Sequence, residues 1–249
     1  MSTVLSAAWR PRSLAALCLS TMVAWQPSAH AALTMSTTRV VYEGERRGVS
    51  LIVANPGKGT FAVQTWVNTH QDDTTSAVPF VVTPALFRLD PAKQQQVRIS
   101  GLPNQLPTDR ESLFYFNLQE IPQVDASHKN VLAIALRTRI KLFYRPAVLK
   151  EGPAHQQTAL KWSVVEHEGK KRLAVDNPTP YHVTFSRLML HGKGEPERLE
   201  IARMIAPLSR QYYDVPSSQL HAPLRVEFTT INDYGGASQP LSVPVPVPL

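Results

Sequence analysis

Cysteine is almost absent from this sequence: Cys18 is the only one in 249 residues. Long apolar runs are absent as well. The most apolar stretch, residues 14–25, is far shorter than the roughly 20 residues that a membrane-spanning helix needs, and Pro27 follows it. We therefore expect a protein that is not embedded in a membrane.

The apolar stretch near the N-terminus is instead typical of a secretory signal peptide. Arg10 and Arg12 precede it, and Ala29-His30-Ala31 forms a small-x-small cleavage site after it. We predict a signal peptide at residues 1–31 and a mature chain that starts near Ala32, outside the cytoplasm.

The loss of Cys18 with the signal peptide would leave the mature chain without any disulfide. Small domains in an oxidising compartment usually contain disulfides, so each domain here must be held together by sheet packing alone.

Acidic residues are outnumbered, with 19 against 26 basic side chains. Removal of the signal peptide takes two arginines and no acid, which leaves a charge of +5. Secretion and the lack of a long basic run argue against a nucleic-acid partner. The surplus indicates an anionic partner or a solvated surface.

Catalytic motifs are scarce. His167-Glu168 lacks the second histidine of a zinc-binding helix, and no G-x-S-x-G sequence is present. Gly57-Lys58-Gly59 and Gly192-Lys193-Gly194 do not extend into phosphate-binding loops. We expect no enzyme activity, no cofactor and no metal site.

Sustained helical periodicity is also missing. Segments that alternate apolar and polar residues, such as Val49-Ser50-Leu51-Ile52-Val53, end at turn residues such as Asn55-Pro56-Gly57. Short alternating strands between turns are typical of an all-β sandwich. The pattern pauses at the polar stretch 150–157 and then resumes, which predicts two β-sandwich domains at residues 32–150 and 151–249.

The C-terminal sequence, Val243-Pro244-Val245-Pro246-Val247-Pro248-Leu249, has two interpretations. Its prolines favour polyproline II. Because prolines two residues apart lie on one edge, the valine amides stay free on the other edge. An edge strand is therefore an equally good interpretation.

Several motifs together point to one protein family. They are Thr38-Arg39-Val40-Val41-Tyr42, Asp109 to Leu118 followed by Glu120-Ile121-Pro122, Ile140 to Pro146, Asn177 to Tyr181, and Ile231 to Gly236. In this order, over nearly the whole mature chain, the sequence closely resembles the periplasmic chaperones of the chaperone/usher pilus pathway.

The resemblance implies two immunoglobulin-like β-sandwich domains arranged at an angle, with an interdomain cleft that faces the client. It also implies a periplasmic chaperone that binds, folds and caps pilus subunits by donor-strand complementation and delivers them to an outer-membrane usher. Self-association of the client-free protein is a further expectation. The alternative is a secreted immunoglobulin-like adhesive or structural module, which would be found in the fibre itself.

Arg39 and Lys141 match family positions that, by the resemblance, bind the C-terminal carboxylate of a pilus subunit in the cleft. A fixed pair of cations suits two carboxylate oxygens, and each charge-assisted hydrogen bond contributes about 1.5–3 kcal/mol. Without the resemblance, Lys141 would be interpreted as a solvated strand lysine.

Residues 134–146 are predicted to form a long strand. Alternation places Leu132, Ile134 and Leu136 on one face of the segment that precedes Lys141. These side chains could belong to the protein's own core, but the resemblance implies that they are lent to a subunit that lacks its final strand. Lys141 has the opposite parity, so a regular strand cannot direct both groups to one face. A bulge, a strong twist or the long lysine stem must resolve this.

Glu111, Arg145 and Asp233 match positions that form an interdomain charge network in the family. We expect this network to set the domain angle, since isolated exposed ion pairs give little stability. The stretch 123–129 is short, which resembles the subclass that serves rod-like pili.

Overall fold

The computed structural model describes residues 33–73, 75–122, 134–150, 152–153, 156–201, 203–216, 219–221 and 223–247. The predicted signal peptide, Leu132 and the stretch 123–129 lie outside these ranges. Within the ranges, no helix is both long and apolar enough to cross a membrane. Strands dominate the described residues, which include a short 3-10 helix at Gln157–Ala159, so the all-β prediction is confirmed.

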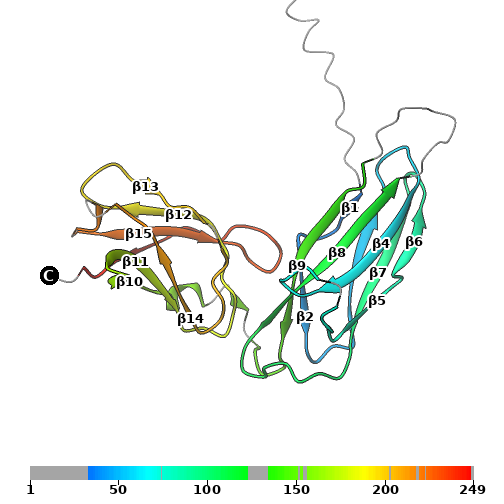
Figure 1. The fold of residues 1–249 in the computed structure, drawn as a ribbon, viewed down its shortest axis with the longest axis horizontal. Coiled ribbons are helices and arrows are strands. Elements are labelled where there is room, and N and C mark those ends of the chain that lie inside the picture. Colours follow the sequence, from blue (N-terminus) through cyan, green and yellow to red (C-terminus); the bar gives the residue numbers. More distant parts are fainter. Residues whose placement is uncertain are drawn as a thin grey trace, which may run out of the picture. The chain divides into compact units, whose positions relative to one another are not determined.

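The first sandwich contains a five-stranded sheet in the order β2-β9-β8-β4-β6 (Figure 1). These strands are β2 (Arg39–Glu43), β9 (Arg137–Arg145), β8 (Ser112–Pro122), β4 (Phe61–Asn68) and β6 (Leu86–Leu89). Its other sheet has the order β1-β3-β7-β5, formed by β1 (Thr34–Met35), β3 (Val49–Ala54), β7 (Gln94–Gly101) and β5 (Phe80–Thr83). The pair β2–β9 is parallel, and the other pairs are antiparallel.

The core of the first sandwich follows from the two-residue period of its strands. In β7, Val97 and Ile99 are fully buried while their neighbours are not. The same alternation buries Val53 in β3 and Leu142 in β9. One face of each sheet therefore supplies the core, and each fully buried side chain of this size stabilises the fold by about 1.5–3 kcal/mol.

The second sandwich contains a three-stranded and a four-stranded sheet, in the orders β10-β11-β14 and β13-β12-β15-β16. Their strands are β10 (Lys161–His167), β11 (Lys170–Asn177), β14 (Ser209–Tyr213), β13 (Glu197–Arg198), β12 (Phe185–His191), β15 (Arg225–Thr230) and β16 (Leu241–Pro244). Trp162, Phe185 and Phe228 pack against one another in its core, with ring centroids 5.3–5.7 Å apart. This aromatic packing joins the two sheets without a disulfide.

The angle between the two sandwiches and the interdomain cleft remain predictions.

The structure decides between the two interpretations of the C-terminal sequence for the residues it describes. Leu241–Pro244 forms edge strand β16, antiparallel to β15. Beyond it, the Val245 amide donates to the Leu224 carbonyl at 2.9 Å, and the Val164 amide donates to the Pro246 carbonyl at 3.3 Å. The edge-strand interpretation is thus confirmed up to Pro244.

The strand predicted through residues 134–146 is shorter than expected. β9 begins only at Arg137, and Ile134 to Leu136 have no strand assignment. A single backbone bond reaches this segment from β8, because the Glu120 amide donates to the Leu136 carbonyl at 2.8 Å. The prediction of a continuous strand from Ile134 was therefore wrong at its start.

Candidate functional site

Two cations meet where β2 runs parallel to β9. Arg39 and Lys141 are paired in register, so their side chains leave adjacent strands on the same face. Both residues are half-buried. The structure thus brings together the two residues proposed as a carboxylate anchor, although they lie far apart in the sequence.

Arg39 and Lys141 have few hydrogen-bond and ion-pair partners for two half-buried cations. Arg39 donates from Nη1 to the Ile231 carbonyl at 3.3 Å, while its buried Nε has no hydrogen-bond partner among the described residues. For the Lys141 ammonium, the described part of the chain offers no hydrogen bond or ion pair. Half-buried cations to which no carboxylate is bonded favour binding of an anion.

Burial also shifts the titration of both groups. Desolvation lowers the pKa of Lys141, and the positive charge of Arg39 lowers it further. Desolvation likewise lowers the pKa of Arg39, although Asp233 and Glu111 oppose this with their negative charges. A bound carboxylate would relieve the repulsion between the two cations.

Arg145 stands at the centre of a separate charge network. Its Nε and Nη2 donate to Glu111 Oε1 at 3.0 and 2.8 Å, and its Nη1 and Nη2 donate to Asp233 at 2.9 and 3.1 Å. Burial alone would lower the pKa of Arg145, but the hydrogen bonds and charges of Asp233 and Glu111 raise it above its ordinary value. The three residues predicted as a network are in direct contact; their influence on a domain angle stays a prediction.

His182 belongs to this network, and the sequence analysis missed it. Its backbone amide donates to Glu111 Oε2 at 2.8 Å, and its Nδ1 lies 3.1 Å from the same oxygen. Glu111 and Arg145 are almost fully buried, so each depends on these partners. His182 directly follows the motif that ends at Tyr181, which was the available signal.

The loop Ile231–Gly236 of the second sandwich contacts this region of the first. Besides the bonds of Ile231 and Asp233, its Gly235 packs against Thr38, where an added Cβ would lie 2.2 Å from Oγ1. Gly235 has φ of +86°, a conformation that residues with a Cβ rarely adopt. Glycine is therefore required at this contact.

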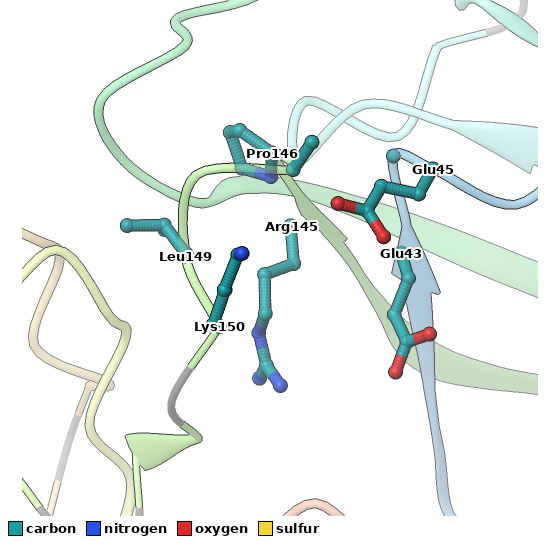
Figure 2. A pocket seen from close by; sticks show the side chains of 8 residues that line it. Glu43, Glu45, Arg145, Pro146, Leu149 and Lys150 are labelled. Carbon is teal, nitrogen blue, oxygen red and sulfur yellow. The ribbon is translucent and has the colours of Figure 1, made fainter.

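A surface hollow lies beside Arg145 but does not include the cation pair. Figure 2 shows Arg145 between the segment that carries Leu149 and Lys150 and the strand that carries Glu43. Neither Arg39 nor Lys141 lines this hollow. Within the described ranges, no cluster of His, Cys, Asp and Glu is suited to a metal ion.

The two described members of the apolar segment are exposed. Ile134 is 62% and Leu136 is 49% accessible to solvent, so neither belongs to the protein's own core. Leu136 has the parity of the buried Ile140, whereas Lys141 has the opposite parity. The β8–β9 register is regular from Tyr144 to Arg137, so no bulge within it resolves the difference.

Comparisons with known proteins agree on one family. Residues 32–150 match "Pili and flagellar-assembly chaperone, PapD N-terminal domain", and residues 155–241 match "Pili assembly chaperone PapD, C-terminal domain". The chain is 39% identical to the probable fimbrial chaperone YadV of Escherichia coli (strain K12), over 89% of this chain and 94% of that protein. It is 37% identical to the chaperone protein PapD of Escherichia coli, over 80% and 81% of the two chains.

The chain belongs to the pilus-assembly chaperone family. Solved chaperone structures have the same fold. The crystal structure of YadV chaperone has a TM-score of 0.73 at 36% identity, covering 86% of this chain and all of that one. The SafB chaperone, solved in complex with the Salmonella enterica SafA pilin, has a TM-score of 0.72 at 28% identity, covering 88% of this chain and 98% of that one.

Membership of the pilus-assembly chaperones decides the function class. The protein is a fimbrial or pilus assembly chaperone, and the alternative of a secreted adhesive or structural module is not supported. The fold of this chaperone family has two β-sandwich domains, so the prediction of two immunoglobulin-like β-sandwich domains is confirmed.

Proposed function

We propose that this chaperone binds the C-terminal carboxylate of a pilus subunit through Arg39 and Lys141. The observation that supports the proposal is the pair itself: two half-buried cations, in register on adjacent strands, with no carboxylate bonded to either in the described chain. Each charge-assisted hydrogen bond to a carboxylate would contribute about 1.5–3 kcal/mol.

The apolar segment before β9 would act as the donor strand. Leu132, Ile134 and Leu136 would fill the open groove of a subunit that lacks its final strand. Burial of each side chain contributes about 1.5–3 kcal/mol, so three give on the order of 5–9 kcal/mol before the cost of ordering. The exposure of Ile134 and Leu136 supports this role, because both are free for a client.

The proposed setting is the periplasm, reached by way of the predicted signal peptide. The partners would be pilus subunits and an outer-membrane usher, with self-association through the exposed apolar segment when no client is bound. The SafB–SafA complex supports a pilin as the client, since SafB is a relative of similar length. The activity is non-enzymatic, because binding and strand donation need no bond to be made or broken.

The test is co-purification of subunits from the periplasm with single variants of the anchor. Lys141→Ala and Arg39→Ala should each stay folded and lose the subunit, because a buried client carboxylate would lose a cationic partner at a cost of about 2–5 kcal/mol. Affinity for the subunit that co-purifies with the parent should fall by about 30-fold or more. Lys170→Ala, an exposed strand lysine of the second sandwich, is the control. Normal subunit yield with either anchor variant would refute the proposal.

A further inference from the structure

A polar cluster holds the first residue of β9 on the outer face of its sheet. Arg137 donates from Nε and Nη2 to Asn117 Oδ1 at 3.1 and 2.5 Å. Its Nη1 donates to Asp72 Oδ2 at 3.1 Å, and its Nη2 donates to Asp72 Oδ1. The guanidinium also lies over the Trp66 ring, 4.9 Å from its centroid. Hydrogen bonds from all three side-chain nitrogens of Arg137 thus fix the orientation of its guanidinium.

The carboxylate that receives Arg137 is itself held in place. Asn68 Nδ2 donates to Asp72 Oδ1 at 2.8 Å, and Asn68 Oδ1 accepts from Asn117 Nδ2 at 2.9 Å. Asp72 has φ of +61°, in the left-handed region that aspartate and asparagine tolerate better than other residues with a side chain. The hydrogen bonds from Arg137 and Asn68 hold the pKa of Asp72 below its ordinary value. The Asp72 carboxylate is therefore ionised at neutral pH.

A second arginine repeats the arrangement two residues later. Arg139 donates from Nη2 to the Thr69 carbonyl at 2.5 Å, and its guanidinium lies 3.8 Å from the centroid of the Tyr115 ring. Thr69 and Asp72 belong to the same turn after β4. The turn therefore holds two successive outward side chains of β9.

This cluster adjoins the exposed apolar segment. Leu136 immediately precedes Arg137, and beyond its bond with Glu120 the segment leaves the sheet. Successive side chains of an extended chain point to opposite faces, so the direction of Arg137 determines the direction of Leu136.

We propose that Asp72 is a positioning residue for client binding: through Arg137 it fixes which face of the chain Leu136 and Ile134 present to a pilus subunit. The proposal rests on the proposed donor-strand function. A segment held in its binding orientation loses less conformational freedom when it enters the client's groove, so the cluster would increase affinity without contacting the client.

The direct test is Asp72→Asn, which removes the charge and keeps a residue that tolerates the left-handed backbone. The matched control is Asp176→Asn, which breaks a similar fork to Arg210 in the second sandwich, where Nε and Nη2 donate at 2.5 and 2.8 Å. Arg137→Lys is a second variant, because it keeps the charge and loses the fork.

Two ligands distinguish positioning of the apolar segment from binding of the carboxylate by the anchor. One is the folded subunit that co-purifies with the parent chaperone, and the other is a short peptide with that subunit's C-terminal sequence and free carboxylate, followed by NMR titration. Asp72→Asn and Arg137→Lys should each weaken binding of the subunit by about tenfold, mainly through faster dissociation, and leave peptide binding unchanged. Native-state hydrogen exchange should quicken at Arg137 to Ile140 and not in β3 or β7.

The outcomes distinguish this inference from the proposed function. Unchanged subunit affinity in both variants would overturn the positioning role. Equal losses for subunit and peptide, or a loss no larger than that of Asp176→Asn, would overturn it as well. If Arg39→Ala leaves both ligands bound as tightly as the parent does, the anchor is wrong, whereas a subunit-specific loss in Asp72→Asn would still support the positioning role.

Discussion

Glu120 is a buried carboxylate that the anchor and the charge network do not use. It is 3% exposed, and its Oε1 accepts the Leu33 amide at 3.0 Å. Desolvation raises its pKa above the ordinary value of 4.5, and the bond from Leu33 only partly opposes this. Folding therefore favours the protonated form of this side chain.

The raised pKa predicts how Glu120 affects stability. Because the folded state binds the proton more tightly than the unfolded state, the contribution of Glu120 is present below pH 4.5 and is lost as pH rises through the raised pKa. Glu120→Gln keeps an acceptor for Leu33 and cannot ionise. We expect the stability of the variant, relative to the parent, to increase from acidic to neutral pH. Urea denaturation at several pH values measures this difference, and a constant difference would contradict the assignment.

At the scale of one element, β9 is a paired strand that follows the exposed segment Ile134 to Leu136. Its even residues Ile140 and Leu142 are buried, and the same parity continues into Leu136 and Ile134, which extend past the core. The sequence pattern does not change there, but the side chains are exposed instead of buried.

This continuity predicts opposite effects for one substitution at two sites. Ile134→Glu should leave the melting temperature of the free protein nearly unchanged, because its side chain is already in solvent, and should reduce both client recovery and self-association. Ile140→Glu, at the same parity and 9% exposed, should cost several kcal/mol and unfold the first sandwich. Thermal melts and subunit yields measure both effects. A large fall in stability for Ile134→Glu would defeat the donor-strand assignment.

At the scale of the whole molecule, the contacts of Arg145 join residues of both sandwiches. Glu111 lies in the first and Asp233 in the second, and each accepts two hydrogen bonds from the one guanidinium. A buried arginine between two carboxylates gives directional bonds, which suits the control of orientation better than a nonspecific apolar contact does.

We expect Asp233→Ala to change the arrangement of the two sandwiches without unfolding either. Arg145 would retain Glu111, so the buried cation keeps a partner in its own sandwich. Small-angle scattering and thermal melts measure the two properties. Asp109→Ala, which breaks an exposed pair with Arg110, is the control and should change neither. A scattering curve identical to that of the parent would count against the network's role.

The sequence by itself determined the all-β class, because alternation between turn residues is a local property that short strands express directly. Its motifs also identified Arg39 and Lys141, which the parallel pairing of β2 and β9 places side by side. The local sequence pattern did not distinguish the two conformations of the C-terminal sequence, since polyproline II and an edge strand have similar backbones. Pairing of β16 with the free edge of β15 distinguished them.

Only the tertiary structure showed where β9 begins and which side chains support it. The alternation of Ile134 and Leu136 is identical to that of Ile140, and only the edge of the core distinguishes exposed from buried members. His182 and Asp72 form hydrogen bonds with partners distant in the sequence, Glu111 and Arg137. Such contacts form when the folded sheets bring separate segments together, so no short stretch of sequence contains the information that specifies them.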